Sequence, residues 1–190
     1  MGTGRPYSVV KTICGIILGG ASCTGKSHVL AETHAFDPAL AAFEMDELGY
    51  SKPHFETHLL EDLEWLRTEL QLHEIQADVE ASSPKVQICK ISLLKLVVGG
   101  QRFITTCGYL PRPDAHFYDL IETALGAELF HVLVNPSIAT HVYRICRRGR
   151  FFHIAKFCRV QRQNTQVPWD ATIRTATDLG KWMKESSLES

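Results

Sequence analysis

The sequence predicts an α/β protein in which a parallel sheet lies between two layers of helices. Three observations predict this class. Apolar runs of strand length alternate with amphipathic stretches of helix length, a continuous apolar run covers residues 13–18, and the pattern Gly-x4-Gly-Lys-Ser follows it at Gly20–Ser27. Strands that alternate with helices along a chain form parallel sheets whose faces the helices cover. We therefore expect a three-layer α/β/α domain.

The first half of the chain is expected to supply two strands and the helices that join them. A helix follows the strand at 13–18, beginning at Lys26 and ending near Phe36-Asp37-Pro38, where aspartate and proline favour a turn. The short apolar run 39–45 predicts the second strand. Apolar residues recur every three or four positions over residues 54–75, which predicts one long amphipathic helix. Pro84 lies at the start of another helix, which ends at the glycines 99 and 100.

The second half is expected to add three strands. Apolar runs at 102–107 and 129–134 predict the third and fourth strands, and between them Asp114 can cap a helix that Gly126 ends. Ser137 can cap the next helix, after which the chain is basic with interleaved aromatic residues up to about residue 166. Residues 171–176 predict a fifth strand and residues 178–185 a last helix. We expect a single domain over residues 1–190.

The composition narrows the class of protein. Of the 190 residues 45% are hydrophobic and 22% charged, and the formal net charge is −1, which argues against a polyanion-binding surface over the whole molecule. The six cysteines form no CxxC pair and are typical of reduced thiols. The longest apolar stretch is too short to span a bilayer. We expect a cytoplasmic protein without a membrane partner, and a nuclear location and the oligomeric state stay open.

The loop after the first strand carries the clearest chemistry. It consists of Gly20, Ala21, Ser22, Cys23, Thr24, Gly25, Lys26 and Ser27. In a loop of this pattern the backbone N–H groups curl round a phosphate, the lysine reaches the terminal phosphates and the serine hydroxyl ligates Mg²⁺. The following helix directs the positive end of its dipole at the anion. The sequence therefore predicts nucleotide binding here, with ATP and Mg²⁺ as the expected ligands.

Two further groups of residues suit phosphoryl transfer. Asp46 follows the second strand, at the sheet edge where open α/β folds bind ligands, and its carboxylate could hold a metal-bound water or accept a proton. Between Leu129 and Trp169 there is no acidic residue. The planar guanidinium groups of the arginines in this segment can hydrogen-bond to phosphate oxygens. Arg144 and Arg148 are the catalytic candidates, and a solvated helix end is the alternative interpretation. The basic residues of the segment are Arg144, Arg147, Arg148, Arg150, Lys156, Arg159 and Arg162.

Other proteins that use such a loop fit the sequence less well. A GTPase would carry Asn-Lys-x-Asp after the fourth strand, where this chain has Asn-Pro-Ser-Ile at 135–138. A motor or AAA-type ATPase would end its third strand in acidic residues, where this chain has Thr-Thr-Cys-Gly at 105–108. His54 and His58 have the spacing of a metal pair on a helix, but no third ligand accompanies them. We interpret these histidines as solvated or substrate-facing.

These landmarks resemble those of the small P-loop kinases of the shikimate-kinase, gluconate-kinase and adenylate-kinase group. The resemblance implies the strand order 2-3-1-4-5, an arginine-rich lid at about residues 146–165, and Lys26 on the transferred phosphate. It also implies that Asp46 binds the metal ion or the acceptor. The acceptor is expected to lie between the lid and residues near Asp46, Gly108 and Tyr109. The landmarks are Gly20–Ser27, Phe43-Glu44-Met45-Asp46-Glu47, Thr106-Cys107-Gly108 and Arg144-x-x-Arg147-Arg148-Gly149-Arg150.

The chain departs from these kinases where they select the acceptor. Shikimate kinases carry Asp-x-Asp where this chain has Glu44-Met45-Asp46, and a glycine triplet where it has residues 107–109. Nucleoside monophosphate kinases place an acceptor-binding arginine between strands two and three, where Arg67 is the only arginine. The leading hypothesis is an ATP-dependent kinase of a small-molecule metabolite. A nucleoside monophosphate kinase and a non-catalytic nucleotide-binding or RNA-associated module are the alternatives.

Overall fold

A computed structural model describes residues 14–45, 52–106 and 115–186, without side-chain detail for Cys14, residues 52–58 and Ala115. Its sheet has five strands, all parallel, in the order β2-β3-β1-β4-β5. This result confirms the predicted α/β class and the strand order that the resemblance implied. The strands are β1 (Cys14–Gly19), β2 (Ala41–Glu44), β3 (Phe103–Thr106), β4 (Glu128–Val134) and β5 (Ala171–Ile173).

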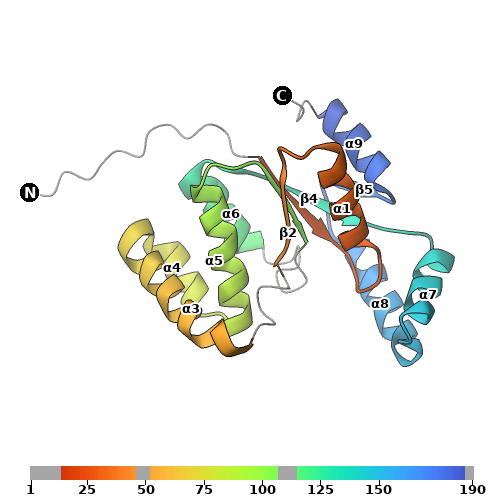
Figure 1. The fold of residues 1–190 in the computed structure, drawn as a ribbon, viewed down its shortest axis with the longest axis horizontal. Coiled ribbons are helices and arrows are strands. Elements are labelled where there is room, and N and C mark those ends of the chain that lie inside the picture. Colours follow the sequence, from red (N-terminus) through yellow and green to blue (C-terminus); the bar gives the residue numbers. More distant parts are fainter. Residues whose placement is uncertain (1–13, 46–51, 107–114, 187–190) are drawn as a thin grey trace, which may run out of the picture.

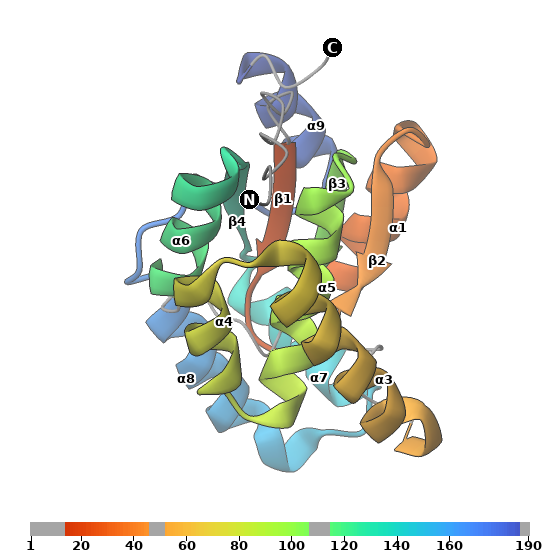
Figure 2. The ribbon, with the colours of Figure 1, turned by 90° about the vertical axis from the view of Figure 1, so that its left-hand side faces the viewer.

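Helices cover both faces of the sheet (Figure 1). One face carries α1 (Lys26–Phe36) and α9 (Ala176–Glu185). The other carries the group in the foreground of Figure 2, which is α3 (Lys52–Trp65), α4 (His73–Glu80), α5 (Pro84–Val98) and α6 (Ala115–Leu125). Beyond the carboxyl ends of the strands, α7 (Ile138–Arg147) and α8 (Ile154–Asn164) form a helical hairpin through the short 3-10 turn Phe151–His153.

The two faces of the sheet build two separate apolar cores. Successive side chains of a strand point to opposite faces, so Ile17 packs among α3 to α6 while Ile16 and Leu18 pack against α1 and α9. At two glycines of β1, an aromatic ring from another part of the chain fills the space that a side chain would take. A Cβ on Gly15 would overlap the ring of Phe103, and one on Gly19 would overlap the indole of Trp169.

The prediction of one long helix over residues 54–75 is wrong, because this segment forms two helices. The chain leaves α3 at Trp65, makes one π-helical turn over Leu66–Leu70, and then reverses at Gln71, whose φ of 51° is left-handed, before α4 begins. Leu66 and Leu70 are both buried on the same core as their helical neighbours. The apolar period therefore continues across the break, and for this reason it predicted one helix where the chain forms two.

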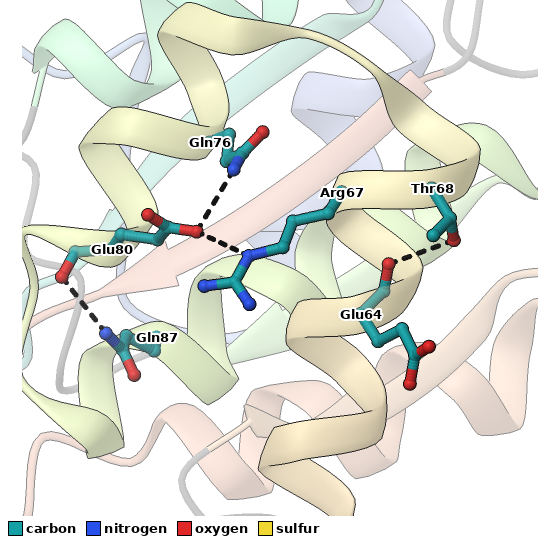
Figure 3. A network of polar contacts seen from close by, with 6 residues as sticks. All are labelled: Glu64, Arg67, Thr68, Gln76, Glu80 and Gln87. Carbon is teal, nitrogen blue, oxygen red and sulfur yellow. Dashed lines mark hydrogen bonds and ion pairs between the residues drawn. The ribbon is translucent and has the colours of Figure 1, made fainter.

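A polar network fastens this break to the helices that follow (Figure 3). Arg67 Nε donates to Glu80 Oε1 at 2.9 Å, and Gln76 Nε2 donates to the same oxygen at 3.1 Å. Gln87 Nε2 of α5 donates to the backbone oxygen of Glu80 at 3.2 Å. The hydrogen bond from Gln76, followed by that from Arg67, lowers the pKa of Glu80 because both favour its ionised form. The guanidinium of Arg67 is thus hydrogen-bonded to a residue of the same helical layer.

The last helix begins with a capping box. Thr175 Oγ1 accepts a hydrogen bond from Asp178 N at 3.2 Å, and Asp178 Oδ2 accepts one from Thr175 N at 3.0 Å. Asp178 Oδ2 also accepts from Arg174 N at 3.0 Å, and this bond is the main reason that the pKa of Asp178 is lowered. These contacts satisfy backbone donors that the first turn of a helix leaves without a partner.

We expect Asp178→Ala to destabilise the protein by about 1 kcal/mol at pH 7, as loss of a helix cap does. The folded pKa of Asp178 lies below the ordinary value of 3.8. The contribution of the carboxylate is therefore full above that value and is lost as the pH falls through the folded pKa. Urea unfolding from pH 7 to the lowest pH at which the protein stays folded measures this, with Asp119→Ala as the control for removal of an exposed carboxylate. A difference that stays constant through this pH range would contradict the assignment.

Candidate active site

The loop Gly20–Ser27 leaves the carboxyl end of β1 and enters the first turn of α1. Gly20 has a φ of 135° and Gly25 a φ of 106°, a region that residues with a Cβ rarely adopt. A Cβ on Gly20 would also lie 2.9 Å from the carbonyl oxygen of Val134. Cys23 adopts a left-handed φ of 67° although it has a side chain. The loop therefore has the curled backbone that the motif predicted, with one strained residue that it did not.

Contacts within the loop position its lysine. Thr24 is fully buried, and its Oγ1 donates to Ala21 O at 2.9 Å. Lys26 Nζ donates to Gly20 O at 2.9 Å and to Ala21 O at 3.1 Å. The ammonium group is thus held across the mouth of the loop, next to the backbone that would surround a phosphate.

A glutamine from the far end of the chain fixes the start of the loop. The buried side chain of Gln161, on α8, accepts a hydrogen bond from Ala21 N at 2.8 Å through Oε1. Its Nε2 donates to Val134 O at 3.2 Å and to Asn135 Oδ1 at 3.0 Å. One amide therefore ties α8 both to the phosphate loop and to the end of β4. The sequence analysis assigned no role to Gln161.

Helix α7 and the turn after it contact the same loop from another side. His141, which is buried, lies with Nε2 at 2.8 Å from Ser22 O. Arg144 donates from Nη1 to Thr24 O, and Arg150 donates from Nη1 to Ser22 Oγ at 3.2 Å. The guanidinium of Arg144 occupies the space that a Cβ on Gly25 would take. The basic segment therefore reaches the loop, as the anion-contact interpretation requires.

These elements enclose a cavity of about 830 Å³ with a strongly positive lining. Glu44 is the only carboxylate among the described residues that line it. Cations gathered at a helix N-terminus, beside exposed backbone N–H groups, are the arrangement that binds phosphates. The lining residues are Ser22, Cys23, Gly25, Lys26, Ser27, His28, Glu44, Thr106, Arg144, Arg147, Arg148 and Arg150.

The structure brings several predicted residues together. Lys26, Ser27, Arg144 and Arg148 all line the cavity, although they come from opposite ends of the chain. Asp46, Gly108 and Tyr109 lie outside the described residues, so their roles in metal and substrate binding stay predictions. The catalytic roles of the four lining residues are likewise predictions.

Three lining residues, His28, Glu44 and Thr106, had no predicted role, and two of them lie at strand ends. Glu44 ends β2 and Thr106 ends β3, and these two residues are partners in the register of the two strands. Thr106 is also paired with Leu18 of β1, close to the start of the loop. Their position at the carboxyl ends of adjacent parallel strands is the signal that could have identified them, because ligands bind at that edge.

A second cavity of about 770 Å³ lies beside the first. His141 and Gln161 line it and also hydrogen-bond to the phosphate loop, so these two side chains connect the second cavity to the loop. It combines apolar groups such as Pro136 and Ile138 with three arginines. Its lining residues are Asn135, Pro136, Ser137, Ile138, His141, Cys158, Arg159, Gln161, Arg162, Thr165 and Arg174.

We expect Gly25→Ala to weaken nucleotide binding by more than about tenfold, because the left-handed φ is strained by a Cβ and the Arg144 guanidinium must move. Titration with a fluorescent ATP analogue measures the dissociation constant. Gly126→Ala is the matched control, since Gly126 also has a positive φ, of 63°, but open space at its Cβ position. Equal affinities for Gly25→Ala and the unaltered protein would show that the loop geometry does not determine binding.

Comparison with known proteins places this fold among small kinases. No protein-family model and no curated protein matches the sequence. Among solved structures, a gluconokinase from Sinorhizobium meliloti is similar with a TM-score of 0.50 and 16% identity, over 87% of this chain and 85% of that one. A shikimate kinase from Acinetobacter baumannii in complex with shikimate has a TM-score of 0.51 and 13% identity, over 93% and 94%.

A third structure is more similar in shape. It is a protein from Chloroflexus aurantiacus that is named provisionally as a kinase, with a TM-score of 0.54 and 15% identity, over 94% of this chain and 97% of that one. Together with the strand order, these similarities show that the chain has the small P-loop kinase fold. In the part of the chain that the structure describes, no helix combines the length and apolar character needed to cross a membrane.

Proposed function

We propose that the protein is a kinase that transfers a phosphoryl group from Mg·ATP to a small-molecule acceptor. The single observation that carries this proposal is the cavity in which Lys26 and four arginines converge on one phosphate loop. Phosphoryl transfer requires positive charge around the phosphates and oriented reactants, with little covalent chemistry from the protein. The cavity supplies the charge, and the fold shared with gluconate and shikimate kinases supports the reaction class.

The two cavities suggest how the nucleotide is held. The phosphates would lie in the loop, with the N-terminus of α1 and Lys26 as their donors. The base and sugar would extend past His141 and Gln161 into the second cavity, where Pro136 and Ile138 offer apolar contact. Because these two side chains line the second cavity and also hydrogen-bond to the phosphate loop, a molecule with a charged end and a planar apolar end would fit between the loop and the second cavity.

The residues around the loop also fit a bound Mg²⁺. Ser27 and Glu44 both line the cavity, and they offer a hydroxyl and a carboxylate. Mg²⁺ keeps several waters and is bound by few protein groups together with substrate phosphates, so this small donor set is sufficient. Asp46, two residues beyond Glu44, stays the second candidate. The ion would neutralise phosphate charge there.

The arginines would act on the transferred group. Arg144 is oriented by its bond to the Thr24 carbonyl, and Arg150 by its bond to Ser22 Oγ, so both forks are held at the loop before ligand arrives. Arg147 and Arg148 line the same cavity. A carboxylate from Glu44 or Asp46 would accept the proton of the acceptor hydroxyl. The hydroxyl oxygen then forms a bond to the γ-phosphorus of ATP while the bond from that phosphorus to the leaving oxygen of ADP breaks. Arg147, Arg148 and Arg150 belong to the lid that we propose at about residues 146–165.

The position of Arg67 favours a metabolite over a nucleoside monophosphate as acceptor. Arg67 is the arginine that a nucleoside monophosphate kinase would need between strands two and three. Its guanidinium pairs with Glu80, and it is not among the residues that line either cavity. Glu44 and Thr106 instead provide hydroxyl-binding groups at the cavity wall.

We expect the purified protein to release ADP from Mg·ATP faster in the presence of one compound from a panel of sugar acids, other hydroxylated metabolites and nucleoside monophosphates. Lys26→Ala should abolish that stimulated release, because it removes the cation nearest the transferred phosphate, while leaving the circular dichroism spectrum unchanged. Lys181→Ala, on the exposed side of α9, is the control for loss of a lysine. Nucleotide binding without stimulation by any acceptor would favour the non-catalytic alternative.

We further expect Glu44→Gln to lower kcat by a factor of about 100 or more, with a smaller effect on the dissociation constant of ATP, because a general base contributes about that factor. Measuring kcat and the dissociation constant of ATP for Asp46→Asn as well decides which of the two carboxylates acts as the base. The unaltered protein and Asp119→Asn, which alters an exposed carboxylate on α6, serve as references. If neither substitution at the end of β2 changes kcat, the base and metal roles lie elsewhere.

A further inference from the structure

The α7–α8 hairpin carries aromatic side chains that are largely exposed. Phe152 is 98% exposed and Phe151 is 58% exposed, at the tip of the hairpin (lower right in Figure 1). Tyr143, on α7, is 64% exposed. Large apolar side chains left in water carry a free-energy cost of roughly 1.5–3 kcal/mol each relative to burial. Three such rings on one hairpin mark a surface that contacts something else.

Cations surround these aromatic residues. Arg147, Arg148 and Arg150 precede Phe151 directly, and Lys156 and Arg159 follow on α8, all of them exposed. No acidic residue occurs between Leu129 and Trp169, whereas the whole chain has a formal net charge of −1. The positive charge is therefore concentrated on this hairpin. We refer to residues 143–159 as the basic-aromatic hairpin.

The combination of rings and cations indicates the chemistry of the partner. Aromatic rings beside arginines and lysines bind single-stranded nucleic acid, because bases stack on the rings while the phosphates contact the cations. An anionic membrane would instead need a broad apolar face on the helix that lies along it. All residues of α8 are described, and none of its large apolar side chains is among the exposed ones. The charge pattern thus complements a flexible polyanion with exposed bases.

We propose that the basic-aromatic hairpin binds single-stranded nucleic acid, with a base stacked on Phe152 and backbone phosphates on Arg147, Arg148 and Lys156. This surface adjoins the phosphate cavity, because Arg147, Arg148 and Arg150 line that cavity. Bound nucleic acid and bound nucleotide therefore draw on the same arginines. Each weakens the binding of the other as a consequence. The inference does not depend on kinase activity.

The test is fluorescence anisotropy with labelled oligonucleotides of about 12 nucleotides, a length within the site sizes of stacking surfaces. RNA and DNA of the same sequence are compared, so that the assay shows which of the two nucleic acids binds more tightly. Each is also measured as a duplex. We expect single strands to bind more tightly than duplexes, whose base faces are covered. The logarithm of the affinity should fall with the logarithm of the salt concentration with a slope of about −2 to −3, as for three or four phosphate contacts.

Substitutions on the hairpin separate stacking from charge. Phe152→Ala should weaken the binding of single strands by a factor of about 5 to 100, the effect of losing one stacked base. It should leave the salt slope unchanged. Lys156→Ala should reduce the slope by about 0.7. Phe36→Ala and Lys181→Ala are the matched controls, since Phe36 is exposed at the end of α1 and Lys181 is exposed on α9.

The outcomes are distinguishable from those of the kinase assay. No binding at low salt, binding that Phe152→Ala does not change, or binding only to vesicles of phosphatidylglycerol would each overturn the proposal. Loss of oligonucleotide affinity when a non-hydrolysable ATP analogue is added supports the proposal that both ligands contact the same arginines. A protein that binds single strands through Phe152 but shows no phosphotransfer would refute the proposed function and leave this inference standing.

Discussion

The side-chain amide of Gln161 is the contact on which the geometry of the site depends. It is buried, and every polar atom of the amide is used, toward Ala21 on one side and toward Val134 and Asn135 on the other. A buried amide left without these bonds would cost about 1–3 kcal/mol. The ends of β1 and β4 and the middle of α8 are therefore held in one arrangement. The conformation of the loop therefore depends on its own internal hydrogen bonds and also on the hairpin that would cover the nucleotide.

That connection explains how so many cations can gather around one cavity. Arg144 and Lys26 donate to loop carbonyl oxygens, so backbone dipoles partly offset their charge. Carbonyl groups lower the cost of bringing the cations together without neutralising them. Glu44 alone among the described lining residues has the opposite sign.

The sequence was sufficient for features that depend on neighbouring residues. The loop, its strand and its helix lie within one continuous segment, and Arg144 and Arg148 lie close together in the basic segment that begins within the helix after Ser137. It was insufficient where the structure depends on distant pairs. Gln161 acts on a residue 140 positions away and, as a polar residue in a basic helix, looks like a surface residue. The break at Gln71 was invisible because the leucine period continues through it. Glu44 was given no role because the predicted strand extended to residue 45 and placed Asp46, not Glu44, just beyond its end.

The ring of Trp169 has a practical consequence for experiments in solution. It packs on Gly19, the residue immediately before the loop, and its Nε1 donates to Asn164 O at 2.7 Å at the end of α8. The indole therefore lies between the two segments that Gln161 connects. The other two tryptophans lie elsewhere, Trp65 beside Lys95 and Trp182 against Phe130. With those two replaced by phenylalanine, the protein carries an intrinsic fluorophore at the base of its loop, and its emission reports movement of loop against hairpin without an attached dye.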